Sequence, residues 1–208
     1  METVFVQATP GRWIGQGWNL VRSHLEIFIA LALIYIALLL AAGALVPFLG
    51  SAVLAGALVP GFFLVCLRVM AGARPQISDL FDGFKYWAAG ILTVGLTAIL
   101  VSIAALFLII PGIFVLALYL FAPLFIIEKK MEFWPAMEAS RRLVLNDLFG
   151  FFLLALAIVG LNFLGFICLF LGLLVTVPIS FMAVTVAFRE LVGPTVYQPP
   201  QAGPVNIP

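Results

Sequence analysis

Three prolines lie inside apolar segments that are otherwise hydrophobic enough to be membrane helices. They are Pro60, Pro123 and Pro178, in VPGFF, APLFI and VPISF. A proline in a helix frees the carbonyl group four residues before it, and lipid offers no replacement hydrogen bond. Interrupted spans at corresponding places of a repeated sequence often border the binding site of a transporter. The prolines therefore mark a candidate central site.

Uncharged polar residues accompany the prolines in the apolar segments. Those placed at membrane depth are Tyr35, Thr93, Thr97, Ser102, Tyr119, Asn162, Thr176, Ser180 and Thr185. Such side chains most often bridge helices or satisfy carbonyls that a proline has freed, and this structural role stands as the alternative to a binding pocket. We take Tyr119, Asn162 and Ser180, together with the three prolines, as the candidate residues of the central site.

The sequence lacks the patterns that catalysis or metal binding would need. Its one histidine, His24, has no second metal ligand or catalytic partner in sight. No pair of aspartates lies at membrane depth, and GARPQISDLFDGF has no phosphate-binding spacing. Cys66 and Cys168 lie in apolar runs, where a thiol usually packs as a small hydrophobic group. We therefore expect no catalytic, metal or cofactor site, and no enzyme activity.

The composition indicates a membrane protein. Hydrophobic residues make up 65% of the 208 residues and charged residues 9%, and the mean hydropathy is +1.27. A water-soluble domain of this size cannot bury so much apolar surface. The net charge of +1 provides no basic face for nucleic acid, so we expect no nucleic-acid partner. The expected fold class is an all-α integral membrane protein, with the phospholipid bilayer as its partner.

Six apolar segments are candidates for membrane spans, each of which needs about 20 residues. They cover residues 25–46, 51–70, 87–110, 112–127, 148–171 and 173–188. Short connections containing Gly and Pro join them in pairs, so we expect three helical hairpins, with Pro111 in the middle turn. The fourth and sixth segments are short, and they must thin the bilayer, extend into their flanks or border a wet vestibule.

The basic residues predict the orientation. All ten lie outside the hairpin turns, and they are Arg12, Arg22, Arg68, Arg74, Lys85, Lys129, Lys130, Arg141, Arg142 and Arg189. Because Lys and Arg in short loops are retained in the cytoplasm, we expect both termini to be cytoplasmic. In the alternative reading the first segment is a cleaved signal, but that segment is longer than the apolar region of a signal peptide.

A short amphipathic segment precedes each hairpin. Apolar residues recur in these segments at helical spacing: Ile14, Trp18 and Val21; then Ile77, Leu80, Phe81 and Phe84; then Phe133, Ala136, Met137, Leu143 and Val144. Helices of this kind lie flat at the level of the lipid headgroups. Their other faces carry charged residues such as Asp79, Asp82 and Glu138, which we expect to be solvated.

The three hairpin units look like copies of one another. Each second span holds one of the three prolines, and NLVRSHLEIF in the first unit matches RLVLNDLFGF in the third. We expect three parallel repeats, at approximately 12–71, 76–131 and 132–192, within a single six-helix domain at 1–192. Residues 193–208, GPTVYQPPQAGPVNIP, are rich in Pro and Gly and predict a disordered cytoplasmic tail.

A longer stretch resembles a known family. FLIIPGIFVLALYLFAPLFIIEKKMEFWPAMEASRRLVLNDLFGFF combines a Pro-Gly turn, a Tyr-x-x-x-Pro span, a charged loop and an A-x-x-A-S motif. With GWNLVRSHLEIFI and VPISFMAVTVAFREL, it is similar to bacterial multi-pass proteins of unknown function related to the membrane domain found beside glycerophosphodiester phosphodiesterases. The resemblance covers most of residues 12–192 and implies six helices in a bacterial inner membrane. It implies no reaction, because the sequence contains no phosphodiesterase domain.

The sequence is compatible with two functions. The first is a non-enzymatic accessory or scaffold protein that binds lipid or a membrane-protein partner, with anionic headgroups meeting Lys129, Lys130, Arg141 and Arg142. The second is a passive permease or channel for a small or amphipathic molecule, built around the proline-bent helices. A continuous polar-lined cavity between those helices favours transport, whereas a packed centre favours the scaffold. No ionisable residue lies at membrane depth, which argues against an ion-coupled pump, and we favour the accessory role.

Overall fold

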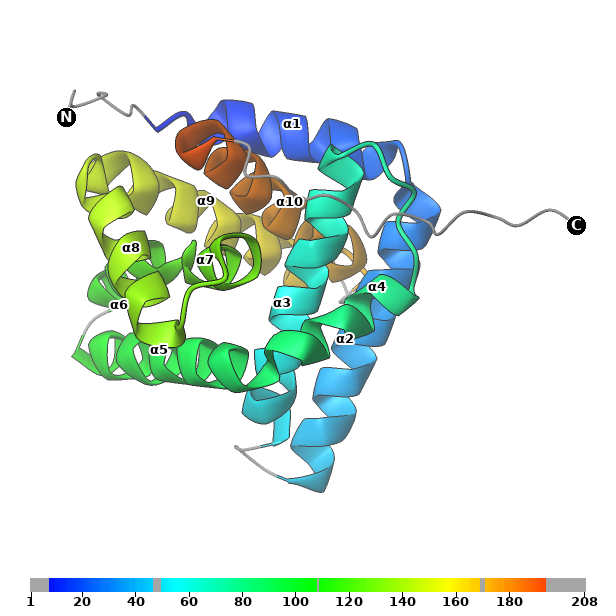
Figure 1. Cartoon of the computed structure of the whole chain (residues 1–208), viewed down its shortest axis with the longest axis horizontal. Helices are drawn as coiled ribbons and strands as arrows, with labels where there is room; N and C mark the ends of the chain where they lie inside the picture. Colours follow the sequence, from blue (N-terminus) through cyan, green and yellow to red (C-terminus); the bar gives the residue numbers. More distant parts are fainter. Residues whose placement is uncertain (1–7, 47–49, 108, 169–170, 194–208) are drawn as a thin grey trace, which may run out of the picture.

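The computed structural model describes residues 8–46, 50–107, 109–168 and 171–193, which form helices joined by short connections, without a β-strand in these ranges (Figure 1). In chain order the helices are α1 (Pro10–Arg22), α2 (Leu25–Leu45), α3 (Gly50–Met70), α4 (Ser78–Phe81), the 3-10 helix η1 (Asp82–Tyr86), α5 (Trp87–Phe107), α6 (Ile109–Tyr119), α7 (Ala122–Lys129), α8 (Phe133–Leu145), α9 (Leu148–Ile167) and α10 (Leu173–Val192). Residues 194–208, most of the tail expected to be disordered, lie outside the described residues.

Six helical segments are long and apolar enough to cross a membrane, which confirms the predicted fold class. They are Leu25–Leu45, Gly50–Met70, Ser78–Leu106, Ile110–Lys129, Leu148–Ile167 and Leu173–Val192. The first segment of each hairpin is between 11% and 22% buried, whereas the second is between 56% and 67% buried. The helices α3, α6 with α7, and α10 are therefore the inner helices, and α2, α5 and α9 are the outer ones.

Each inner helix is held by elements of the next hairpin. The short helices α4 and η1 pack on α3, α8 packs on α6 and α7, and α1 packs on α10. The outer helices follow the same order, because α5 packs on α3, α9 on α6, and α2 on α10. In Figure 1 the helices α1, α4 and α8 lie on three sides of the molecule. Since the first elements pack on the last helix, the arrangement closes into a ring.

Glycines bring α3 into backbone contact with its neighbours. A Cβ atom on Gly61 would overlap the carbonyl oxygen of Leu80 in α4. A Cβ atom on Gly90 in α5 would likewise overlap the carbonyl oxygen of Gly56. So close an approach leaves room only for glycine and places Cα–H groups against carbonyl oxygens. The carbonyl group of Gly56, which Pro60 frees, therefore lies against the backbone of α5.

All three inner prolines are buried, but they affect their helices differently. Pro60 and Pro178 lie inside α3 and α10, which are continuous helices around them. Pro123 follows an interruption, because α6 ends at Tyr119 and α7 begins at Ala122. Pro123 thus occupies the first turn of α7, where a missing N–H group leaves no hydrogen bond unmade.

The hairpin turns and span lengths differ in part from the sequence expectations. Pro111 was expected between two spans, but it lies in the first turn of α6, a position at which a helix tolerates proline. The two short spans are longer than expected, because their helices continue to Lys129 and Val192 in the charged flanks. Both short spans therefore reach their full length by extending into their flanks.

The buried face of α1 includes only one of the regularly spaced apolar residues of this segment, Val21. Its buried residues are Trp13, Gly17 and Val21, whereas Trp18 is exposed. The periodicity of large apolar residues alone does not reveal this face, because it includes a glycine. A Cβ atom at Gly17 would press on the backbone of α10, at the amide nitrogen of Ala183. Gly17 therefore lets α1 approach α10 closely.

Candidate functional site

Two pockets lie between the inner and outer helices. The Asn162 pocket has a volume of about 240 Å³, and its lining includes Tyr35, Ile158, Asn162, Val177 and Ser180. The Thr93 pocket has a volume of about 310 Å³, and its lining includes Thr93, Val94, Thr97, Leu116, Tyr119 and Pro123. Phe63, Leu120 and Phe181 line both. The two pockets therefore adjoin, with side chains of α3 and α10 between them.

Four of the six candidate residues line these pockets, namely Asn162, Ser180, Tyr119 and Pro123. The other two, Pro60 and Pro178, are buried in α3 and α10 and are not among the lining residues. The structure thus brings together the polar candidates and one proline. The other prolines belong to the helices that form the walls.

Asn162 and Ser180 connect α9 to α10. The Asn162 Nδ2 group donates to Ser180 Oγ at 2.8 Å and to the carbonyl oxygen of Ile158 at 2.9 Å. Ser180 Oγ donates in turn to the carbonyl oxygen of Thr176 at 2.8 Å. The Asn162 Oδ1 atom, in contrast, is buried without a hydrogen-bond partner among the described residues. Asn162 therefore bridges two helices, and its Oδ1 atom is enclosed by the protein without a partner in the described residues.

Thr93 and Thr97 contribute polar atoms that the sequence analysis placed at membrane depth but did not assign to the site. Thr93 is 1% exposed, and within the described chain the Oγ1 atoms of both residues are buried without a partner. A threonine in a helix commonly donates to the carbonyl group one turn earlier, as Thr185 does to Phe181 at 2.8 Å. Behind the wall of the Thr93 pocket, two hydroxyl groups are therefore buried that their own helix does not satisfy.

Aromatic side chains fill the space on the C-terminal side of the pocket residues in α7 and α10. Phe181 stacks on Phe62 with ring centroids 4.5 Å apart. Farther along, ring contacts at 5.0 to 6.3 Å link five buried side chains, namely Trp13, Phe121, Phe125, Phe151 and Phe188. On this side the pockets are bordered by packed rings, and these offer no polar lining for a channel.

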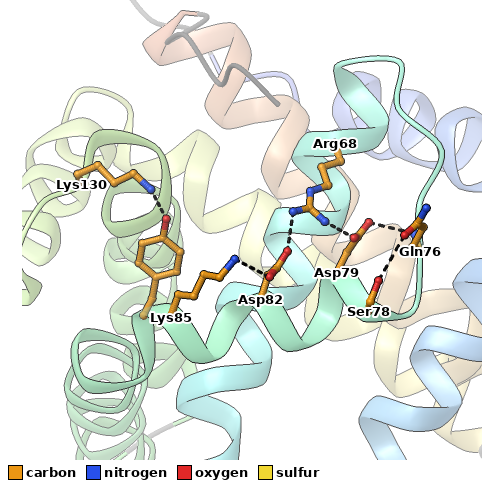
Figure 2. A network of polar contacts seen from close by, with 8 residues as sticks. Arg68, Gln76, Ser78, Asp79, Asp82, Lys85 and Lys130 are labelled. Atoms are coloured by element: carbon orange, nitrogen blue, oxygen red, sulfur yellow. Dashed lines mark hydrogen bonds and ion pairs between the residues drawn. The ribbon is translucent and has the colours of Figure 1, made fainter. Parts of the chain in front are cut away.

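Ion pairs attach α4 and η1 to the C-terminal end of α3. Arg68 pairs with Asp79 and with Asp82, at 2.6 Å for the latter, and Lys85 pairs with Asp82 at 2.7 Å (Figure 2). Hydrogen bonds from Lys85 and Arg68 lower the pKa of Asp82 from its usual 3.8. Asp79 was expected to be solvated, but it is buried, because the glycine contacts bring α4 against α3. Sequence spacing gives no signal for a pairing between separate hairpins.

The C-terminal end of α10 is attached to α1 and α7. Glu190 accepts a hydrogen bond from Trp13 Nε1 at 2.9 Å and pairs with Arg12. Arg189 lies 3.1 Å from Glu128, and the two side chains are 17% and 2% exposed. Neither Glu128 oxygen nor the Arg189 Nε and Nη2 groups make a well-aligned hydrogen bond within the described residues. The buried pair is thus held by charge attraction without directed hydrogen bonds.

Ser140 of α8 hydrogen-bonds to the backbone at the break between α6 and α7. Its side chain is fully buried, accepts a hydrogen bond from the Phe121 N–H group at 3.2 Å and donates to the carbonyl oxygen of Leu118 at 2.8 Å. It therefore satisfies two backbone groups that the break leaves without helical partners. In the sequence, this residue is the serine that ends the A-x-x-A-S motif.

Three of the four basic residues expected to meet headgroups already have partners in the protein. Arg141 binds Glu138 through Nε at 2.8 Å and Nη2 at 2.9 Å, and Arg142 binds it through Nε at 2.8 Å. These hydrogen bonds, from Arg141 and then Arg142, lower the pKa of Glu138 to about 2. Lys130 donates to the hydroxyl group of the tyrosine that ends η1 (Figure 2). The fourth residue, Lys129, is half-buried at the end of α7.

The pockets combine apolar walls with a few uncharged hydrogen-bonding groups. Such a lining is more compatible with an apolar or weakly polar molecule than with a charged one. Among the described residues, no group of His, Cys, Asp and Glu side chains is placed to hold a metal ion. No protein-family model matches the chain, and no solved structure matches it.

Proposed function

We propose that this protein is a non-enzymatic accessory or scaffold protein of the bacterial inner membrane that binds a lipid in its two adjoining pockets. The observation that carries the proposal is the lining, which is apolar apart from a few uncharged polar groups. An empty apolar space forfeits van der Waals contacts with its walls, and water gains little there. In a membrane the hydrocarbon chain of a lipid is the occupant that restores those contacts.

The pocket volumes support an occupant of limited size. They are about 240 and 310 Å³, whereas small-molecule sites usually measure about 300–1,000 Å³. One hydrocarbon chain or a compact lipid therefore fits better than a whole phospholipid. This size accords with an accessory protein that holds a single lipid and uses its outer helices to contact a membrane-protein partner.

The competing function is a passive permease or channel for a small or amphipathic molecule. A polar-lined path through the centre favours that function, but these pockets have apolar walls, and packed rings such as Phe62 and Phe181 border them. We therefore expect no glycerol or ion flux through the protein in liposomes. Flux that disappears when the Thr93 pocket is filled by a larger side chain would favour the permease.

We infer that the three hairpin units are parallel repeats. Their ring-like packing, in which each unit holds the inner helix of the preceding one, supports this inference. The match between the first and third units pairs Gly17 with Ser140 and Phe28 with Phe151, and all four are buried. Equivalent positions in the sequence thus have equivalent burial.

We further propose that both termini and the ion-paired ends of the inner helices face the cytoplasm. The distribution of the ten basic residues supports this orientation. Arg141 and Arg142 share one carboxylate, so with Lys129 and Lys130 they keep a net positive charge that attracts anionic headgroups. Labelling of single cysteines from either side of the membrane tests the orientation, and outside access at Lys130 would overturn it.

Native mass spectrometry of the protein in a mild detergent tests lipid binding. The wild type should retain at least one lipid, and Val94→Trp, which fills the Thr93 pocket, should lose it. Leu106→Trp is the matched control, because this residue lies on the same helix but is 85% exposed, and it should retain the lipid. Unfolding curves establish that each variant is folded. A wild type without lipid, or a Val94→Trp variant that keeps it, contradicts the proposal.

A further inference from the structure

A third pocket lies between α5, α6 and α8, which pack on one another (Figure 1). This Arg141 pocket has a volume of about 510 Å³, and its lining includes Leu96, Leu100, Trp134, Met137, Glu138 and Arg141. It is larger than the Asn162 and Thr93 pockets, and unlike them it is lined by charged side chains. An occupant can therefore meet both apolar and charged groups in one place.

The apolar part of this pocket belongs to a membrane span. Leu96 and Leu100 lie one turn apart on the outer helix α5, and both are half-buried, so an occupant can reach them. Met137 of α8 adds a flexible apolar side chain to the same lining. A hydrocarbon chain gains van der Waals contacts with such a surface, whereas water gains little there. This part of the pocket favours the chain of a lipid.

The charged part of the pocket has an arginine that can bind a second anion. Arg141 donates to Glu138 through Nε at 2.8 Å and Nη2 at 2.9 Å, and its Nη1 group makes no hydrogen bond within the described residues. The side chain of Arg141 is 43% exposed, so a ligand can reach it. Glu138 also pairs with Arg142, so two positive charges share one carboxylate. The excess positive charge favours an anionic group beside Arg141.

An exposed tryptophan indicates where the pocket lies in the membrane. Trp134, in the first turn of α8, lines the pocket and is 63% exposed. Exposed tryptophans are typical of the membrane interface, where the lipid headgroups lie. The anion that Arg141 meets at this level is therefore a headgroup, and the chain attached to it can enter the apolar part of the pocket.

We propose that the Arg141 pocket binds a single-chain lipid with an anionic headgroup, such as a lysophosphatidylglycerol. The phosphate group accepts from Arg141 Nη1, and the hydrocarbon chain packs on Leu96 and Leu100. The volume lies within the range of small-molecule sites, about 300–1,000 Å³, which suits one chain better than two. The inference rests on the proposed function only for the attraction of these basic residues to anionic headgroups, and it adds a site distinct from the two inner pockets.

Native mass spectrometry of the full-length protein in an uncharged detergent tests the site with three probes. Oleoyl lysophosphatidylglycerol has one chain and a net negative charge, oleoyl lysophosphatidylcholine has the same chain without a net charge, and dioleoylphosphatidylglycerol adds a second chain. The wild type should bind the first probe about fivefold more tightly than the second, because one basic side chain near an anionic headgroup contributes about that factor. Dioleoylphosphatidylglycerol should bind more weakly than its single-chain counterpart.

Two variants of the same ion pair should change this preference in opposite directions. Arg141→Gln should remove it, whereas Glu138→Gln, which removes the competing carboxylate, should increase it. Arg74→Gln is the matched control, because it removes the same charge from an exposed residue outside the pocket, and it should keep the preference. Unfolding curves establish that each variant is folded. A preference that survives in Arg141→Gln, falls in Glu138→Gln or falls equally in Arg74→Gln overturns the inference.

Filling the apolar part of the pocket tests the placement of the chain. Leu100→Trp should weaken binding of both lysolipids. Ile103→Trp should leave both unchanged, because this residue of the same helix is 53% exposed and is not part of the lining. Equal losses in the two variants, equal binding of the two-chain lipid, or a wild type without a preference overturns the inference. None of these results affects the lipid in the inner pockets, which Val94→Trp tests separately.

Discussion

The C-terminal ends of the inner helices carry paired charges, whereas the polar groups in their middle are uncharged. At the ends, Arg68 faces two carboxylates and Glu190 faces both Arg12 and the Trp13 indole. In the middle, Thr93 keeps a buried hydroxyl group without a partner in the described chain. Since buried polar groups in proteins are nearly always paired, the contrast predicts that side chains at the paired ends contribute more to stability than the Thr93 hydroxyl group does.

Removal of Arg68 should have the largest effect on stability. Arg68→Ala leaves the carboxylate of Asp79, whose side chain is 8% exposed, without its counter-charge. Breaking a buried ion pair by removing one partner costs about 3–5 kcal/mol. Lys85→Ala is the matched control, because Lys85 belongs to the same network but its side chain is 72% exposed. Denaturant unfolding in detergent measures both variants. Equal, small losses for the two would show that the ends are not the stabilising region.

In the middle of the bundle, removal of a polar group should stabilise the protein instead of destabilising it. Thr93→Val removes a buried hydroxyl group that has no partner, so the lipid-free protein should become more stable by about 1 kcal/mol. Thr185→Val removes a hydroxyl group that donates to Phe181, and it should cost about 1 kcal/mol. Unfolding of delipidated samples in the same detergent compares them. A loss of stability in Thr93→Val would indicate that its hydroxyl group has a partner in the protein.

Protonation of Asp82 at low pH should have the smallest effect on stability. The pKa of Asp82 is lower in the folded protein than its usual 3.8, so its ion pairs contribute stability above that pH. This contribution is lost as the pH falls from about 3.8 through the folded pKa. The Asp82→Asn variant should therefore lose less stability than the wild type between pH 5 and pH 3 in unfolding experiments. Parallel pH profiles would show that Asp82 does not anchor η1.

Hydropathy and charge were enough to predict the six apolar helices and their pairing into hairpins, because a membrane span depends on local composition. Contacts between helices, in contrast, do not depend on local composition, and the sequence did not predict them. An inner helix such as α3 is apolar on every side, so periodicity does not reveal which face meets which neighbour. The pairing of Arg68 with Asp79 depends on backbone contact at Gly61, which a pattern of apolar residues does not encode.

Part of the pocket lining coincides with residues selected from the sequence. Pro123 was selected as a proline in an apolar segment, and Tyr119, Asn162 and Ser180 as uncharged polar residues at membrane depth, and all four line the pockets. Thr93 was not selected, since what distinguishes it is that its hydroxyl group has no partner in the described residues. A threonine in an apolar helix is by default expected to bond to its own backbone, and only the structure identifies one that does not.

The contact between α1 and α10 has a consequence for biosynthesis. A ribosome releases α1 first, but the surface on which α1 packs belongs to α10, the last helix of the ring. While the first two hairpins enter the membrane, Trp13 lacks its partners, because neither Phe151 nor Glu190 has yet been made. The nascent protein therefore exposes the apolar face of α1 until translation of α10 is complete. A chaperone or protease that recognises this face would distinguish unfinished chains from finished ones.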